Sequence, residues 1–278
     1  MSFVEILKAI VMGVVEGFTE WIPISSTGHM ILIDEIIHLD VTPEFRELFL
    51  VVIQIGAALA IVVPYFSKLN PFDPRKKRAQ KKATWQLWAK IVIACIPSVI
   101  LGFLFDDWVG EHLYNGLVVA IMLIVYGVLF IVVENLNRNK EPSIARLGQI
   151  SYSTAFYIGL FQALALVPGT SRSGATILGA MILGCARPIG AEFSFFVGLP
   201  IIAGASFLRI IKYEGAFGAP EIWLLAVGSV TAFLVSVYSI RFFIGWIRKN
   251  DFKLFGYYRI VLGVIVLIWF GISSLMAA

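Results

Sequence analysis

The stretch EGFTEWIPISSTGH, residues 16–29, gathers two carboxylates, the hydroxyl run Ser25-Ser26-Thr27 and a histidine into fourteen positions of a largely apolar chain. Hydrophobic residues make up 59% of the 278 positions and charged residues only 14%. The mean hydropathy of +0.88 lies well outside the range of soluble domains. The sequence therefore predicts an integral membrane protein, in which a polar stretch such as this one needs a functional explanation.

Apolar segments long enough to cross a bilayer, about 20 residues each, recur along the chain. We count six, at residues 49–66, 87–105, 116–133, 193–211, 222–240 and 258–274. The first segment of the chain carries several charges and no cleavage site follows it, so we expect no cleaved signal peptide. Cys95 and Cys185 lie in apolar surroundings without a metal-ligand or disulfide spacing, and we interpret both as packing residues.

Charges are sorted between alternate loops. Basic residues dominate three loops, at Lys68, Arg75, Lys76, Lys77, Arg78, Lys81, Lys82 and Lys90, at Arg138, Lys140 and Arg146, and at Arg248, Lys249 and Lys253. The intervening loops are acidic. The positive-inside rule therefore predicts a cytoplasmic location for the basic loops and an outer location for both termini. The basic run suits contact with anionic lipid, and we expect no nucleic-acid partner.

The chain reads as an internal duplication within a single domain, residues 1–278. An offset of 146 residues aligns Gly13 with Gly159, Glu16 with Gln162 and Ser25 with Ser171. The repeats cover about residues 1–145 and 146–278. Each half contains one broken apolar segment followed by three spans, an odd number, so the sequence predicts two repeats of inverted topology.

The broken segments are residues 3–37 and 152–184, which Pro23 and Pro168 interrupt. Their arms are too short or too polar to cross a membrane, so each is interpreted as a re-entrant helix–loop–helix. Irregular backbone at membrane depth needs protein or water around it, and we expect the two loops to meet in a shared polar cavity. The predicted fold is all-α, with six transmembrane helices and two re-entrant segments.

The first loop carries an acidic pair. Glu16 and Glu20 are four residues apart and share one helical face. Such carboxylates suit Mg²⁺ or Ca²⁺, whose coordination water and phosphate oxygens can complete. Two acids that face water in a vestibule are the alternative.

Ser25, Ser26 and Thr27 follow Pro23 and precede His29. The hydroxyl run alone is typical of a helix cap. A hydroxyl three residues before an imidazole on the first helical turn can also form a nucleophile beside a base, and the helix start would favour an anion.

The second loop reads PGTSRSG, residues 168–174, with Thr176 just beyond. Arg172 lies between Ser171 and Ser173, and its planar guanidinium can bind phosphate oxygens two at a time. Structural pairing with Glu16 or Glu20 would equally satisfy this arginine. We interpret Arg172 as a phosphate ligand, because glycines and hydroxyls at a second helix start surround it. The other predicted phosphate ligands are hydroxyls of the two loops, at Ser25, Thr27, Ser171, Ser173 and Thr176.

Together the two motifs resemble the signature of the undecaprenyl-diphosphate phosphatases, the bacitracin-resistance protein family of bacterial membranes. The resemblance covers nearly the whole chain and shows no departure inside either motif. It implies removal of the terminal phosphate of a polyprenyl diphosphate to give the carrier lipid of peptidoglycan synthesis, and hence bacitracin resistance. It also implies site roles: metal ligands at Glu16 and Glu20, the nucleophile at Ser26, proton transfer by His29, and phosphate binding by Arg172. Attack by Ser26 or by a water that it orients stays open.

A secondary transporter or flippase for a phosphorylated lipid is the rival, because it shares inverted repeats and broken helices. The compact grouping of Ser26, His29 and Glu20 favours the enzyme, and a purely structural scaffold is least compatible with buried charges. We expect a multi-pass protein of the bacterial cytoplasmic membrane, with its cavity open to the outer side. The small-residue run at 198–204 allows helix packing within one chain or in a homodimer.

Overall fold

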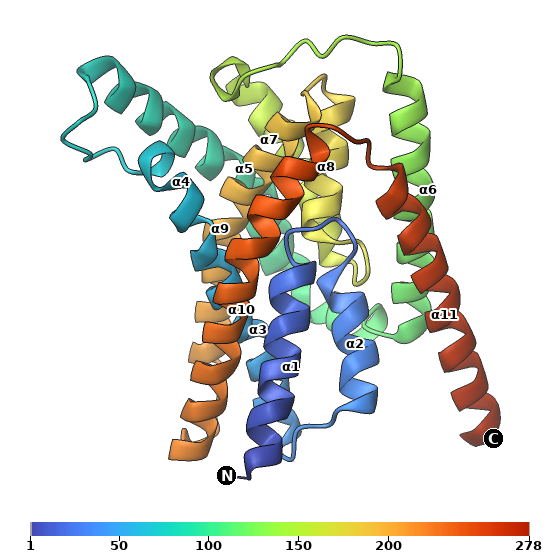
Figure 1. Ribbon diagram of the computed structural model, residues 1–278. Coiled ribbons are helices and arrows are strands. Elements are labelled where there is room, and N and C mark those ends of the chain that lie inside the picture. The colour runs from blue at the N-terminus through green and yellow to red at the C-terminus, as the bar shows by residue number, and fades with distance from the viewer. Residues whose placement is uncertain (1, 278) are drawn as a thin grey trace.

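The computed structural model describes the backbone of residues 2–277 and the side chains of residues 2–271. Within that part of the chain the fold is entirely helical, apart from one isolated bridge between Ile144 and Cys185. The elements are α1 (Phe3–Thr19), α2 (Ser26–Ile36), α3 (Pro43–Ala60), α4 (Val62–Leu69), α5 (Arg78–His112), α6 (Gly116–Asn137), η1 (Leu147–Gln149), α7 (Tyr152–Ala163), η2 (Leu164–Leu166), α8 (Arg172–Ile182), α9 (Arg187–Ile211), α10 (Ala219–Ile247) and α11 (Lys253–Ala277). Figure 1 shows them as one bundle of long helices around shorter ones.

The long helices confirm the polytopic membrane prediction. Among the described residues, α5, α6, α9, α10 and α11 are long and apolar enough to span a membrane, and α3 with α4 makes a sixth span if the pair counts as one. That pair bends by 57°, where the sequence predicted one span over residues 49–66. Pro64 explains the bend, because it has no N–H for the carbonyl of Ala60 and its ring crowds that turn.

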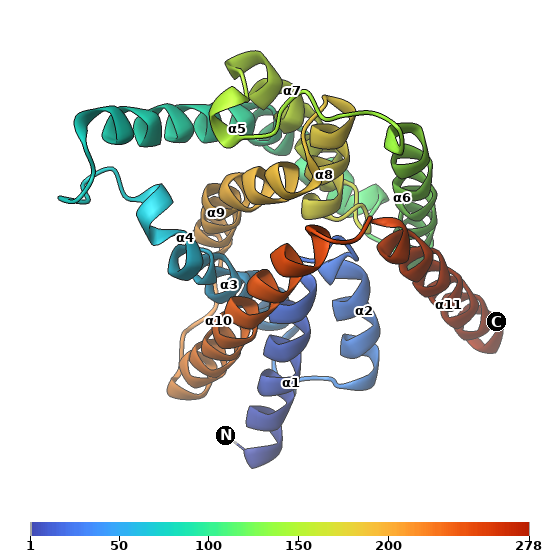
Figure 2. The ribbon, with the colours of Figure 1, turned by 45° about the horizontal axis from the view of Figure 1, so that its top comes forward.

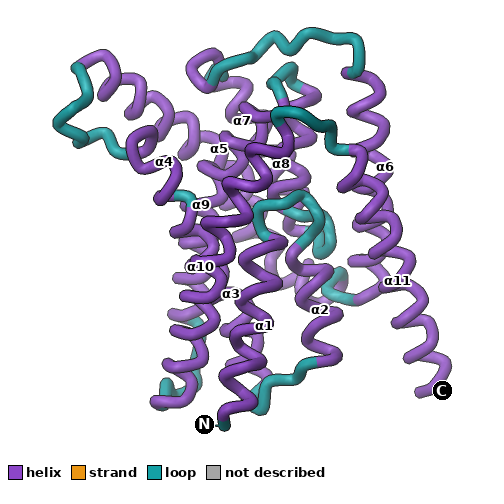
Figure 3. Tube along the Cα trace, in the orientation of Figure 1, coloured by secondary structure: helices purple, strands orange, loops and turns teal. Residues whose placement is uncertain are grey.

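Both broken segments fold as helix–loop–helix hairpins. The α1–α2 and α7–α8 hairpins come from opposite ends of the molecule, and their connecting loops lie at mid-height (Figures 1 and 3). Pro23 and Pro168 lie in these loops rather than in a helix. The loops therefore lie where the sequence predicted a meeting point.

Each hairpin packs on a long helix from the other half of the chain. Helix α1 lies against α10 and α7 against α5. Small residues allow this close approach: a Cβ at Gly13 would lie 2.6 Å from the Gly228 carbonyl, and one at Gly159 would run into the Ala94 carbonyl. In Figure 2, α6 and α11 run side by side at one edge, where Gly127 and Gly256 face each other's backbone.

The ends of the bundle differ in charge, as the loop pattern indicates. The connections α4–α5, α6–α7 and α10–α11, which hold the basic loops, lie at the end of the molecule opposite the two chain termini (Figure 1). We call it the basic end.

Cys95 and Cys185 are free and buried, which confirms their packing role. The exchanged hairpin contacts agree with two repeats, whose inverted symmetry stays a prediction.

Candidate active site where the two loops meet

The two loops share one backbone device. Ser25 and Ser171 cap α2 and α8 with φ of 73° and 68°, the positive-φ non-glycine residues of the described chain. Each side chain accepts a hydrogen bond from the backbone N–H three residues on, at 3.3 Å from Gly28 and 3.1 Å from Gly174. Left-handed backbone at a residue with a Cβ costs about 1–2 kcal/mol and persists only where the surroundings impose it. Both helix starts are thus held in a matched, constrained geometry.

Glu20 joins the two loops. Its Oε2 accepts a hydrogen bond from the Ser26 hydroxyl at 2.8 Å, and its Oε1 accepts from Arg172 Nη2 at 2.9 Å and Nε at 3.3 Å. Only 8% of the Glu20 side chain and 11% of the Arg172 side chain are exposed. Charged hydrogen bonds gain strength in such sheltered surroundings. Glu20, Ser26 and Arg172, with Glu16 and His29 beside them, form what we call the two-loop site.

Arg172 is held on three sides. Its guanidinium lies 5.0 Å from the ring centroid of the buried Trp21, and Nη1 donates to the Ser194 carbonyl at 3.1 Å. A Cβ at Gly198 would collide with the guanidinium, so this glycine makes room for it. The small-residue run at 198–204 therefore serves the site within one chain at its first position. The fork of Arg172 is oriented by this packing before any ligand arrives.

Glu16 lies one helical turn before Glu20 and is fully buried. Neither of its carboxylate oxygens has a hydrogen-bond partner in the structure. An unsatisfied buried carboxylate is costly, and a cation or a proton relieves it. Two neighbouring carboxylates fit a hard divalent ion, although among the described residues no group of three or more His, Cys, Asp or Glu side chains is arranged to hold a metal ion by itself. Water and substrate oxygens would have to complete the coordination.

The histidine has different partners from those expected. His29 Nδ1 lies 2.8 Å from the Ser25 carbonyl oxygen, and Nε2 lies 2.6 Å from the Tyr258 hydroxyl, with the two rings stacked. The hydroxyl of Ser26 instead donates to Glu20. The base hydrogen-bonded to Ser26 is therefore a carboxylate, because the imidazole turns toward α11.

The predicted phosphate ligands divide into two groups. Ser171 and Ser173 lie in the second loop with their hydroxyls 3.2 Å apart, and Ser173 donates to the Glu20 carbonyl at 3.1 Å. Thr27 is half-buried on the first turn of α2. Thr176 lies one turn inside α8, where its hydroxyl donates to the Arg172 carbonyl at 2.9 Å and also contacts Ser194. Thr176 thus supports the helix behind Arg172, and the buried Ser173 joins the two loops through its bond to Glu20. Ser25 and Ser171 cap the two helices.

Sequence reasoning missed a second arginine, Arg259, which is completely buried. Its guanidinium donates to the Pro23 carbonyl of the first loop at 3.3 Å, and to the Gly169 and Thr170 carbonyls of the second at 2.8 and 2.9 Å. Arg259 therefore fastens the two loops to each other. The signal was present in the sequence, because a charged residue inside the predicted span 258–274 is expensive unless it has partners.

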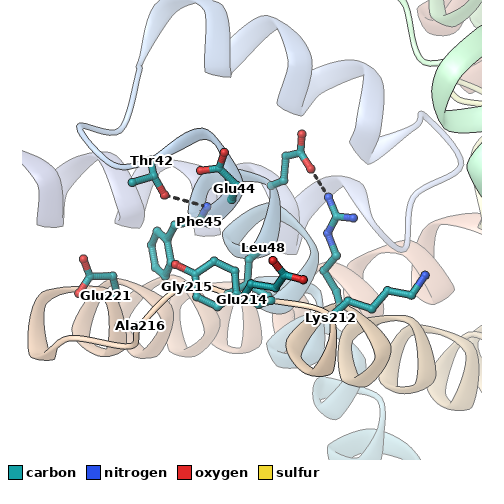
Figure 4. Close-up of a pocket in the computed structure, with 12 residues that line it drawn as sticks. Thr42, Glu44, Phe45, Leu48, Lys212, Glu214, Gly215, Ala216 and Glu221 are labelled. Carbon is teal, nitrogen blue, oxygen red and sulfur yellow. Dashed lines mark hydrogen bonds and ion pairs between the residues drawn. The ribbon is translucent and has the colours of Figure 1, made fainter.

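A cavity of about 560 Å³ lies elsewhere, between the start of α3 and the α9–α10 connection (Figure 4). Four of its lining residues are acidic, Glu44, Glu47, Glu214 and Glu221, and an Arg209–Glu47 ion pair crosses it. The cavity is at the end that holds the chain termini. It matches the acidic loops of that end and contains none of the predicted site residues.

The chain is similar to a well-populated family. The bacitracin resistance protein BacA family matches residues 9–265. A relative from Enterococcus faecalis is 52% identical over 270 residues, which cover 96% of this chain and 98% of the relative. One from Desulfitobacterium hafniense is 52% identical over 277 residues, 99% of this chain and 100% of the relative, and one from Latilactobacillus sakei is 53% identical over 270 residues, 96% and 98%. All three relatives are named undecaprenyl-diphosphatase.

Proposed function

The chain belongs to the bacitracin resistance protein BacA family, and from that premise we propose that it removes the terminal phosphate of undecaprenyl diphosphate at the two-loop site. The observation that carries the proposal is Glu20, which accepts from the Ser26 hydroxyl with one oxygen and from Arg172 with the other. A nucleophile, its base and a phosphate-binding cation are thus in contact. The names of the relatives favour this phosphatase over the transporter or flippase alternative.

In the first step, Glu20 takes the proton of the Ser26 hydroxyl as that oxygen attacks the terminal phosphorus. A bond forms between Ser26 Oγ and phosphorus, and the bond from phosphorus to the bridging oxygen breaks. Undecaprenyl phosphate leaves with the electron pair of that bond. Activation of a hydroxyl by an adjacent base is the general requirement of such covalent catalysis, and the 2.8 Å Ser26–Glu20 hydrogen bond supports it.

Arg172 binds the equatorial oxygens of the transferred phosphoryl group, where negative charge is concentrated in the transition state. Its stacking on Trp21 and its bond to the Ser194 carbonyl keep the fork oriented while it exchanges the Glu20 carboxylate for phosphate. The capped start of α8 adds backbone N–H groups that favour the same anion.

In the second step, water attacks the phosphorus of the phosphoserine and the bond from phosphorus to Ser26 Oγ breaks. Inorganic phosphate leaves, and Ser26 Oγ takes back the proton that Glu20 has held since the first step. We propose that His29 accepts the proton of that water, while the Tyr258 hydroxyl holds the imidazole ring in place.

Glu16 and Glu20 would hold a divalent cation, Mg²⁺ or Ca²⁺. The unpartnered oxygens of buried Glu16 support this assignment. When bound, the ion would supply charge neutralisation for the diphosphate.

The protein is a multi-pass membrane protein, and our proposal extends to its orientation. The basic end is assigned to the cytoplasm, and the acidic end with both termini to the outside, by the positive-inside rule. The substrate head then enters from the outer leaflet, and its tail lies among the exposed apolar side chains. A homodimer is part of the proposal through α9, where Gly204 has open space beside it and Phe207 and Leu208 are exposed.

The test is phosphate release from undecaprenyl diphosphate by the purified protein in detergent, with Mg²⁺, with Ca²⁺ and with a chelator. We expect metal-dependent release that Glu16→Gln reduces. Lipid binding without release under every metal condition would refute the phosphatase and leave the transporter.

A further inference from the structure

A second charged cavity, of about 470 Å³, lies at the basic end between the α4–α5 connection and α5. Four cationic side chains line it, Lys68, Arg75, Lys76 and Lys90, with Asp73 as the acidic one. Residues Leu147 and Gly148 of η1 close it on one side. None of the two-loop site residues lines this cavity, so the reaction does not account for it.

Two of the four cations have carboxylate partners. Lys68 donates to Glu192 at 2.6 Å, and Arg75 binds both oxygens of Asp73 at 3.0 Å. Asp73 also accepts the Arg75 backbone N–H, and these bonds hold the pKa of the Asp73 carboxyl below its usual value. These charges are balanced within the protein.

Neither of the other two cations forms an ion pair. Lys76 Nζ donates to the Asn70 carbonyl at 2.8 Å and to the Thr84 hydroxyl at 2.7 Å, and the only acid of the cavity that acts on it is Asp73, which Arg75 already neutralises. Lys90 is 92% buried, since its exposed fraction is 8%, and its ammonium donates to the Gly148 carbonyl at 3.3 Å and lies 5.8 Å from the Tyr152 ring centroid. A buried ammonium without a carboxylate is expensive. The cavity therefore lacks about two negative charges.

The surroundings of the cavity are those of a membrane interface. Phe72 and Trp85 stack edge to face at 5.7 Å beside the basic loop, and 74% and 53% of these residues are exposed. Exposed aromatic side chains at the end of membrane spans are typical of the headgroup region. A ligand that combines an anionic head with an apolar body fits this position.

We propose that this cavity binds the phosphate-monoester headgroup of a membrane lipid, with the phosphate between Lys76 and Lys90. A phosphate monoester carries about −1.5 to −2 charges at pH 7, which matches the two ammonium groups that form no ion pair. A phosphodiester headgroup carries one charge and matches them less well. The site is separate from the two-loop site, so it neither requires nor supplies catalysis.

The test measures binding of dioctanoyl phosphatidic acid to the full-length protein in a neutral detergent by thermophoresis. We expect it to bind at least about tenfold more tightly than dioctanoyl phosphatidylglycerol, phosphatidylcholine or inorganic phosphate, a difference of about 1.4 kcal/mol. Arg172→Met should bind equally well. That variant separates this proposal from the proposed function, because it removes the phosphate ligand of the two-loop site and leaves the cavity intact.

The variant K76M/K90M should lose at least about tenfold in affinity, and Lys76→Met alone, at the half-exposed edge, should lose part of it. The matched control is K140M/K249M, which removes two exposed lysines of the same end outside the cavity. An equal loss in that control would show unspecific attraction and overturn the proposal. Equal affinity for phosphatidylcholine, or for inorganic phosphate, would also overturn it, the latter in favour of a free-anion site.

Discussion

The α1–α2 and α7–α8 loops share the backbone conformation of their helix caps but carry different functional side chains. Ser25 and Ser171 cap their helices with nearly the same φ and accept from equivalent glycines. The next position is Ser26 in the first loop and Arg172 in the second. In the proposed mechanism, one loop supplies the nucleophile at the first helical position, and the other supplies the cation that binds its phosphate.

The acids separate the two copies further. Both oxygens of the buried Glu16 carboxylate lack a hydrogen-bond partner, whereas its buried counterpart Gln162 donates through Nε2 to Ser98 at 3.1 Å and leaves only Oε1 without one. An amide oxygen without a partner carries no net charge, while an unpaired carboxylate attracts a cation. The two loops thus share the conformation of their helix caps and differ in charge, which agrees with the proposal that each contributes a different part of one reaction.

The largest effect should come from removing the nucleophile. Ser26→Ala is expected to lower kcat by about 10³-fold or more, because the acceptor oxygen of the phosphoryl group is lost. The measurement is phosphate release by a variant of unchanged melting temperature. The control is Ser239→Ala on α10, a buried serine that donates to the Val235 carbonyl. Full activity in Ser26→Ala would assign the attack to water.

The second-largest effect should come from removing Arg259, which joins the two loops, and it should appear as a loss of stability. Arg259→Met leaves carbonyls of both loops without a donor and should lower the free energy of unfolding by about 3 kcal/mol. Thermal unfolding in detergent measures the change. Arg241→Met, at an exposed arginine of α10, is the control. Equal melting temperatures for the two variants would mean that the loops hold together without Arg259.

The next prediction concerns Arg172, the cation of the second loop. Arg172→Lys keeps the charge but loses the planar fork, and we expect kcat/KM to fall by about 10²-fold. The control is Arg187→Lys, whose arginine pairs with Glu134 at the basic end and should leave phosphate release within twofold. If lysine replaced Arg172 without loss, charge alone would be sufficient.

Equivalent glycine substitutions in the α1–α2 and α7–α8 hairpins should lower the free energy of unfolding by similar amounts. Gly13→Ala and Gly159→Ala each force a Cβ onto a backbone carbonyl of the facing helix, at an expected cost of about 2 kcal/mol. Gly245→Ala meets no atom within 4 Å and should be neutral or slightly stabilising. Thermal unfolding of the three variants compares them. A cost in one hairpin alone would break the proposed equivalence of the copies.

The smallest effect concerns the histidine. Tyr258→Phe removes the hydroxyl at 2.6 Å from His29 and should lower kcat less than about tenfold, the value of one hydrogen bond. Tyr257→Phe changes an exposed neighbour and is the matched control. A loss as large as that of Ser26→Ala would make Tyr258 part of the reacting group itself.

Periodicity and composition predicted five of the spans and both broken segments, because Pro23, Pro168 and the polar runs leave few ways to satisfy backbone groups in a membrane. They did not predict the 57° bend that divides the first predicted span into α3 and α4. The same reasoning brought Glu20, Ser26 and Arg172 into one site. It did not predict which base contacts Ser26, since residues three apart share a helix face without fixing a rotamer. Arg259 was missed because its partners are carbonyls, which every residue carries and no pattern distinguishes.

We propose that the two loops form one reacting unit through Glu20. The first measurement is a double-mutant cycle on phosphate release, with Ser26→Ala, Arg172→Met and the double variant. We expect strong non-additivity, with the double variant no slower than Ser26→Ala alone, because residues that act as a unit fail together. Losses that multiply would show that Ser26 and Arg172 act independently and that the two loops do not form one reacting unit.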